Sequence, residues 1–362
     1  MSCSTLSRLE SEVRTSGDRP NAEAILMPRV APRSVGMASC RNRWGVVLAG
    51  GDGTRLRPLT QFICGDDRPK QFCALLDGAT LLEHTLRRAQ HLVQPERVLV
   101  SLTSHHHSWY SQEPSLHLSQ CVVQPANKGT GTAIAHSLRS IQALDENAVV
   151  AILPSDHHYE DEALFLAGLD SAFDRADDYP ESVILLGAAP DYPEVEYGWI
   201  QLGPAARGDR ENLFHVRAFQ EKPPVDVARA LLRQGALWNM FVMVGRVGAF
   251  LRMIQAALPE LDELLAAAPL WQGSELHLSP ALYETIPSLN LSQHVLAMQT
   301  DRLLALRLRA VGWSDLGDPG RALLAALDHG NRPNWAVEWQ NAKPVSKPVQ
   351  PSVQPLTRQV SA

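Results

Sequence analysis

The sequence predicts an α/β protein with a doubly wound, mostly parallel sheet and an α+β second half. Between residues 44 and 188, continuous apolar runs of strand length alternate with amphipathic segments of helix length. After about residue 195 the runs become shorter and turns become more frequent. The chain has 362 residues, of which 45% are hydrophobic, so it can bury a large core.

The expected elements follow these runs in order. Four strands are predicted in the first half, over 44–49, 97–102, 148–153 and 183–188. Helices are predicted over 132–144 and over 80–92, where Thr80 is the expected N-cap. Shorter strands are predicted in the second half, over 198–202, 214–219 and 238–245. Residues 1–42 lack periodicity and are expected to form a mobile leader, and the Pro-rich stretch 341–362 a disordered tail.

Composition excludes several classes of partner. A net charge of −6 disfavours a general nucleic-acid binder. Neither a membrane span nor a signal peptide is expected, because no apolar run is long enough for a span and the N-terminus lacks an apolar core. The five cysteines form no CxxC pair, which favours a reducing cytoplasm.

The first strand is followed by the loop "GGDGTRLR", in which Gly50, Gly51 and Gly53 precede Arg55. Bare backbone lets peptide N–H groups approach an anion, and a guanidinium beside them favours phosphate. The segment is not a P-loop, and it lacks the third glycine of a dinucleotide fingerprint, so a Rossmann oxidoreductase is disfavoured. The alternative is an ordinary turn with solvated arginines.

Two aspartates are candidate ligands of Mg²⁺, which prefers oxygen. Asp156 follows the third apolar strand in "PSDHH", and Asp315 lies in the turn "GWSDLGDPG". By itself, Asp315 could equally form a turn. The histidine runs 105–107 and 157–158 have no Cys or His partners at structural-zinc spacing, so a histidine metal site is not expected.

Four further residues are candidates for the site, but each taken alone could have an ordinary structural role. Lys70 in "RPKQF" could be a surface lysine, Glu221 and Lys222 in "FQEKPP" a surface ion pair, and Asn239 in "LWNMFVMVG" a core amide.

Together these segments resemble the sugar-1-phosphate nucleotidyltransferases, and within them the mannose-1-phosphate guanylyltransferase (GDP-mannose pyrophosphorylase) branch. The resemblance runs in order over residues 44–320 and is carried by "LAGGDGTRLRPLT", "PKQF", "QPANKGTGTAIAHSL", "LPSDHH", "EYGWIQLG", "FQEKP" and "WSDLG". It implies a Rossmann-like, glycosyltransferase-A-like fold over 43–335. The nucleotide-binding part would cover about 43–190 and the sugar-phosphate part about 191–320. The substrates would be a nucleoside triphosphate and a sugar 1-phosphate, and a homo-oligomer is compatible with the resemblance.

The resemblance also implies roles for individual residues. Arg55, Lys70, Asp156 and Lys222 would be catalytic, and Asp156 and Asp315 would hold Mg²⁺. The nucleotide would be bound by Gly50, Gly51, Gly53, Thr54, Gln124 and Thr130. The sugar phosphate would be bound by Gly198, Glu221, Lys222 and Asn239.

Three departures from the family pattern concern the spacer and the substrate pockets. The spacer "QFICGDDR" is longer than expected, "WNSG" has become "WNMF", and "RNTAP" has become "KGTGT". Because of the last two departures, the sequence does not identify the sugar or the base. Glucose 1-phosphate with dTTP or UTP is therefore an alternative substrate pair, and a non-catalytic sugar-nucleotide sensor is an alternative function.

Overall fold

The computed structural model describes residues 42–117, 120–207, 212–266, 276–277, 280–328 and 332–342. The expected leader falls outside this part of the chain except for residue 42. The expected tail falls outside it except for residues 341 and 342, which end helix α11.

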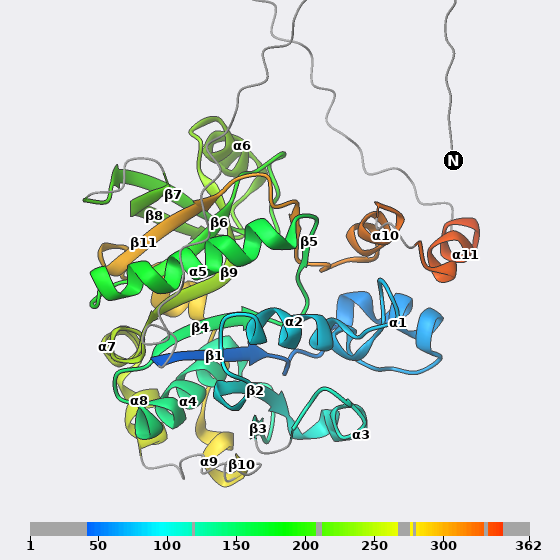
Figure 1. The fold of residues 1–362 in the computed structure, drawn as a ribbon, viewed down its shortest axis with the longest axis horizontal. Helices are drawn as coiled ribbons and strands as arrows, with labels where there is room; N and C mark the ends of the chain where they lie inside the picture. Colours follow the sequence, from blue (N-terminus) through cyan, green and yellow to red (C-terminus); the bar gives the residue numbers. More distant parts are fainter. Residues whose placement is uncertain are drawn as a thin grey trace, which may run out of the picture. The chain divides into compact units, whose positions relative to one another are not determined.

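The fold is built on a ten-stranded sheet with the order β10-β3-β2-β1-β4-β9-β6-β11-β8-β7 (Figure 1). Its strands are β1 (Arg43–Leu48), β2 (Val98–Thr103), β3 (Cys121–Gln124), β4 (Val149–Pro154), β6 (Val183–Ala188), β7 (Gly198–Ala205), β8 (Leu213–Glu221), β9 (Leu237–Arg246), β10 (Leu276–His277) and β11 (Leu303–Leu308). A separate pair joins β5 (His158–Tyr159) to β12 (Trp313–Ser314). The four strands predicted in the first half are confirmed within one residue at each end.

The sheet is mixed, so the expectation of a mostly parallel sheet is not confirmed. β1 pairs in parallel with β2 and β4, as expected. However, β9 lies antiparallel between β4 and β6, and β8 runs antiparallel to both β7 and β11. Most residues of β9 are buried, as in a central parallel strand, and such an apolar run does not encode the direction of its neighbours.

Helices cover both faces of the sheet. On one face, Leu82 and Leu86 of α2 and Phe165 of α5 join the core. On the other, Ile134 of α4 and Phe250 of α7 join a second core. The bounds of the helices are α1 (Arg57–Cys64), α2 (Leu81–Gln90), α3 (His107–Tyr110), α4 (Gly129–Leu144), α5 (Glu162–Asp178), α6 (Val225–Arg233), α7 (Val247–Ala257), α8 (Pro259–Ala266), α9 (Pro280–Thr285), α10 (Pro319–Asp328) and α11 (Asn334–Ala342).

The predicted N-cap of α2 is confirmed, because the Thr80 side chain accepts a hydrogen bond from the Glu83 N–H at 3.1 Å. A third apolar cluster joins α1 to the C-terminal helices α10 and α11. In it, the Trp335 indole donates to the Leu75 carbonyl at 3.0 Å, and Phe62 packs edge-on against Trp339. Within the described residues, no helix is both long and apolar enough to cross a bilayer.

Candidate functional site

The parallel strands bring several candidate residues to one edge of the sheet. β1 runs into the glycine loop, β4 runs into Asp156, and β3 ends at Gln124. Because β1, β2, β3 and β4 all point the same way, their carboxyl ends meet at this edge.

The glycine loop is held open by its neighbours. The Gln71 amide donates to the carbonyls of Ala49 and Gly51, both at 2.8 Å. Gly53 has a left-handed φ of 60°, and a Cβ there would lie 3.2 Å from the Lys70 nitrogen, so glycine is required on both counts. A Cβ at Gly51 would meet nothing within 4 Å, so the absent side chain leaves open space beside the loop.

Gln71, the third residue of "PKQF", therefore fixes the backbone of the glycine loop. Sequence reasoning selected Lys70 and missed Gln71, whose burial against the glycine loop is known only from the structure. Gly50 is fixed in turn, because its carbonyl accepts from the Thr103 hydroxyl at 2.7 Å. Thr54 is exposed and begins the short 3-10 helix Thr54–Leu56 that carries Arg55.

Lys70 brings the two candidate metal ligands together. Its ammonium lies 2.6 Å from the Asp156 carboxylate and 3.3 Å from the backbone carbonyls of Asp315 and Leu316. These residues come from three segments separated by up to 246 positions. The structure thus places the Lys70 ammonium against the side chain of Asp156 and the backbone of Asp315, and the metal-binding role of the two aspartates stays a prediction.

Asp156 is held in its charged form. Burial acts to raise its pKa, but the Lys70 ammonium and His157 outweigh it, so the pKa lies below the ordinary value. The neighbouring His157 ring is buried, and desolvation lowers its pKa to about 4. His157 is therefore neutral at pH 7.

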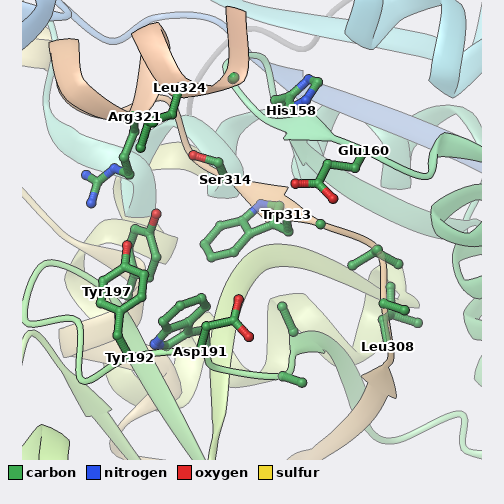
Figure 2. A pocket seen from close by; sticks show the side chains of 17 residues that line it. His158, Glu160, Asp191, Tyr192, Tyr197, Leu308, Trp313, Ser314, Arg321 and Leu324 are labelled. Atoms are coloured by element: carbon green, nitrogen blue, oxygen red, sulfur yellow. The ribbon is translucent and has the colours of Figure 1, made fainter. Parts of the chain in front are cut away.

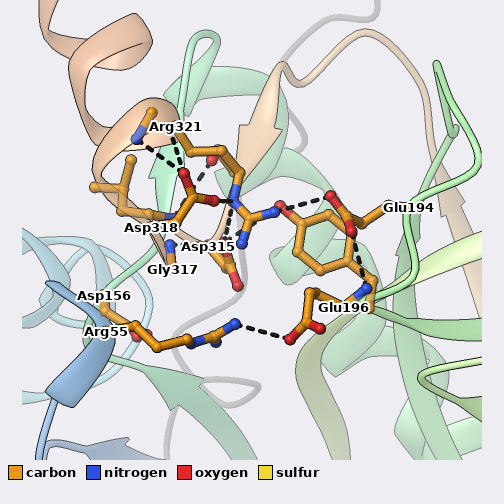
Figure 3. Close-up of polar contacts among 12 residues, drawn as sticks. Arg55, Asp156, Glu194, Glu196, Asp315, Gly317, Asp318 and Arg321 are labelled. Atoms are coloured by element: carbon orange, nitrogen blue, oxygen red, sulfur yellow. Dashed lines mark hydrogen bonds and ion pairs between the residues drawn. The ribbon is translucent and has the colours of Figure 1, made fainter. Parts of the chain in front are cut away.

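Asp315 is oriented by contacts to one of its two carboxylate oxygens (Figure 3). Oδ1 accepts from the Gly317 N–H at 2.8 Å and from the Tyr197 hydroxyl at 3.2 Å, and it lies 3.0 Å from Nε of Arg321. Arg321 is itself paired with Glu194 and Asp318, both at 2.9 Å. Asp315 therefore does form a turn, through the hydrogen bond from the Gly317 N–H to its Oδ1. This bond does not use Oδ2, so the turn is compatible with a metal-binding role for that oxygen.

Glu196, which sequence reasoning missed, links the two expected ends of the site. Its carboxylate lies 2.8 Å from Arg55 (Figure 3) and 3.3 Å from Lys222. Lys222 and then Arg55 lower its pKa. The two cations predicted to bind different substrates thus share one exposed anion.

The predicted sugar-phosphate residues form one row across three strands. Gly198 of β7 is directly opposite Glu221 of β8 and Asn239 of β9. A Cβ at Gly198 would lie 2.8 Å from the Glu221 carboxylate and 3.3 Å from the Asn239 side chain, so only glycine leaves both polar groups in place. Burial raises the pKa of Glu221.

Gln124 and Thr130 are engaged within the protein. Gln124 is buried, donates to the Ser101 hydroxyl at 3.0 Å and accepts from the Tyr283 hydroxyl. The Thr130 hydroxyl accepts from the Leu291 N–H at 3.0 Å, which ties the start of α4 to residues 289–291. The contact of these two side chains with the nucleotide stays a prediction.

Backbone strain accompanies these motifs. Lys222, Phe241 and Leu316 have left-handed φ values of 49°, 54° and 46°. Phe241 stands where the family pattern has glycine, and its N–H donates to the Asn239 side-chain oxygen at 3.1 Å. Non-glycine residues in this conformation cluster at functional sites.

A cavity of about 370 Å³ adjoins the site on its Asp315 side (Figure 2). Tyr197, Ser314 and Arg321 line it together with Trp238 and Trp313. Trp238 precedes Asn239 on β9, and successive side chains of a strand point to opposite faces. None of the residues predicted to bind substrate is part of its lining.

Comparisons with known proteins show which family the chain belongs to. Mannose-1-phosphate guanylyltransferase of Escherichia coli K12 is 26% identical over 281 residues, which is 75% of this chain and 57% of that protein. The alginate biosynthesis protein AlgA of Pseudomonas aeruginosa is 29% identical over 278 residues, 75% of this chain and 56% of that protein. The chain thus spans little more than half the length of these relatives.

Solved structures share the fold. One from Thermus thermophilus, described as mannose-1-phosphate geranyltransferase, aligns with a TM-score of 0.64 and 27% identity over 76% of each chain. A UTP-bound UGPase from Acinetobacter baumannii aligns with a TM-score of 0.52 and 19% identity, over 83% of this chain and 98% of that one, and shows the fold alone. The family described as nucleotidyl transferase matches residues 44–329, most of the chain. With its glycine loop, lysine and two aspartates at one sheet edge, the chain belongs to the nucleotidyl transferase family.

Proposed function

We propose that the chain joins a sugar 1-phosphate to a nucleoside triphosphate and releases pyrophosphate. The observation that carries this proposal is the cluster of Lys70, Asp156 and Asp315 beside an open glycine loop. Such a cluster combines a cation and oxygen ligands, the two groups that a reaction between polyanions needs.

The nucleotide would lie on the glycine loop. The open space at Gly51 admits a phosphate against the backbone, and Arg55 follows on the 3-10 helix that begins at Thr54. Arg55 would neutralise the leaving pyrophosphate, and Lys70 would contact the α-phosphate. Both cations are held by carboxylates, Arg55 by Glu196 and Lys70 by Asp156, and phosphate oxygens would replace these partners.

Mg²⁺ fits the remaining ligands. Lys70 pairs with Oδ2 of Asp156, and the hydrogen bonds and ion pair described for Asp315 fall on its Oδ1. Oδ2 of Asp315 is thus left for a hard cation, while Oδ1 of Asp156 lies 3.9 Å from Nε2 of His157, beyond hydrogen-bond distance. When bound, Mg²⁺ would supply charge neutralisation at the phosphates.

The sugar phosphate would bind at the row formed by Gly198, Glu221 and Asn239. The Lys222 ammonium would contact its phosphate group. Glu221 and Asn239 offer polar groups to sugar hydroxyls on either side of the bare Gly198 backbone. Lys222 would exchange Glu196 for the phosphate.

The reaction needs no protein base. The attacking group is a phosphate oxygen of the sugar 1-phosphate, and the second pKa of a phosphomonoester, about 6, leaves it mostly ionised at neutral pH. Since His157 is buried, the imidazole next to Asp156 is also poorly placed to take a proton. The protein would contribute alignment and electrostatic stabilisation.

The substrates we propose are GTP and mannose 1-phosphate, giving GDP-mannose. "PKQF" and the named activity of the guanylyltransferase relatives support this pair. The test is a matrix of four nucleoside triphosphates against several sugar 1-phosphates, read as Mg²⁺-dependent pyrophosphate release. If dTTP or UTP with glucose 1-phosphate is at least tenfold more efficient, the guanylyltransferase assignment is wrong. Binding without turnover for every pair would instead establish a sensor.

A further inference from the structure

The acidic residue of the glycine loop meets two histidines from a distant segment. Nε2 of His105 lies 2.8 Å from Oδ1 of Asp52, and Nε2 of His106 lies 3.4 Å from the same oxygen. The two histidines belong to the 3-10 helix Ser104–His106, which follows β2, so the carboxyl ends of neighbouring strands bring the three side chains together. All three ligand atoms lie within 4.8 Å of one another.

These distances match a metal site. Ligands about 2.0–2.1 Å from a tetrahedral Zn²⁺ lie about 3.3 Å from one another. The two separations from Oδ1 of Asp52, 2.8 and 3.4 Å, lie close to this value, and the ligand atoms of the two histidines lie within 4.8 Å of each other. Each neutral imidazole carries a single N–H, and moving that proton to Nδ1 turns the Nε2 lone pair towards the ion without release of a proton.

The surroundings hold two of the ligands in place. The Asn127 amide donates to Oδ2 of Asp52 at 3.1 Å, and Asn127 in turn accepts from the Gly129 N–H at 3.0 Å. This leaves Oδ1 to face the histidines, with the carboxylate oriented by an outer hydrogen bond. The His106 ring is fixed by edge contacts with Phe72 and by Trp109.

We propose that Asp52, His105 and His106 bind a divalent transition metal such as Zn²⁺, separate from the Asp156–Asp315 site. Two imidazoles and one carboxylate favour Zn²⁺ or a similar ion over Mg²⁺, which prefers oxygen ligands. The side chain of His106 is only 2% exposed, whereas those of His105 and Asp52 are 50% and 39% exposed, so a fourth position is open to solvent. Because Asp52 lies between Gly51 and Gly53, the ion would fasten the glycine loop to the end of β2.

Metal binding by the tag-free, metal-stripped full chain tests this without any substrate. Zn²⁺ is titrated by calorimetry and Co²⁺ by its visible absorption, in the presence of millimolar Mg²⁺. We expect one equivalent to bind, and His105→Ala and Asp52→Asn to weaken binding at least tenfold. Since His105 is half exposed, His105→Ala should fold normally, as a thermal melt would verify.

Two controls locate the ion. His107→Ala removes the exposed third histidine of the same run, and Asp156→Asn alters the proposed Mg²⁺ site; both should bind Zn²⁺ as the unmodified chain does. The proposal is overturned if the unmodified chain binds no equivalent more tightly than His105→Ala does. It is also overturned if His107→Ala or Asp156→Asn weakens binding as much as His105→Ala. Loss of catalytic activity has no bearing on any of these readouts.

Discussion

Replacing Lys222 by Met separates the two ends of the proposed site. In the free protein Lys222 has an exposed ion pair with Glu196, worth about 0.2–1 kcal/mol. On binding, the lysine would exchange this pair for a charge-assisted bond to the sugar phosphate, worth about 1.5–3 kcal/mol. The net loss in Lys222→Met is therefore about 0.5–2.8 kcal/mol, which corresponds to a roughly 2- to 100-fold rise in KM for the sugar phosphate.

The assay is pyrophosphate release with each substrate varied in turn at saturating levels of the other. KM for the nucleoside triphosphate should change little in Lys222→Met, because its phosphates would lie on the glycine loop, Arg55 and Lys70. Arg55→Met should instead raise KM for the nucleoside triphosphate and change KM for the sugar phosphate little. Arg229→Met, which removes an exposed cation of α6, is the charge control and should alter neither KM. If Lys222→Met weakens the nucleotide as much as the sugar phosphate, "FQEKP" has been assigned to the wrong end of the pocket.

Three further sets of substitutions test the metal ligands, the buried carboxylate and the strained backbone. Asp156→Asn and Asp315→Asn should each lower turnover by orders of magnitude, with partial recovery at high Mg²⁺; near-normal activity of Asp315→Asn would leave that residue only its turn-forming role. Because burial raises the pKa of Glu221 in the folded state, its ionisation costs stability as pH rises from about 4.5 through the folded pKa. Glu221→Gln should thus gain unfolding free energy relative to the unmodified chain between pH 4 and 7 in chemical denaturation, while losing affinity for the sugar phosphate; a constant difference across this range would contradict the assignment. At Phe241, whose φ is 54°, the Gly variant should be more stable than the Ala variant by about 1 kcal/mol, the reverse of the usual order, and an Ala variant of equal or greater stability would refute the strain.

The sequence predicts the strands of the first half well because each is a continuous apolar run bounded by turn residues. β1, β4 and β6 are buried along almost their whole length, and their pattern is visible without any partner. The order and direction of the strands cannot be predicted in this way, because they depend on contacts between distant segments. β9 pairs with β4, β6 and β7, and no local pattern specifies that it enters the sheet antiparallel.

The same distinction applies to the site. Lys70, Asp156 and Asp315 were predictable because each lies in a recognisable motif, and the structure brings them together. Glu196 opens the quoted segment "EYGWIQLG" but was not singled out, and Arg321 lies outside the quoted segments, because the partners that give them a role are distant in the chain. Glu196 matters through its distances to Arg55 and Lys222, which are 141 and 26 positions away in the chain.

The backbone conformations add an argument that residue identities alone do not provide. Lys222 follows Glu221, Phe241 lies two residues after Asn239, and Leu316 follows Asp315, and all three have left-handed φ values. Each costs on the order of 1–2 kcal/mol, a cost that persists only where the surrounding structure compels it. At Phe241 the family pattern has the glycine that would remove this cost, and here the strained turn still delivers the N–H that binds the Asn239 oxygen. The turn that orients Asn239 thus forms here with phenylalanine at the position of the family's glycine, which is expected if the orientation of that amide, rather than the small side chain, is what the turn serves.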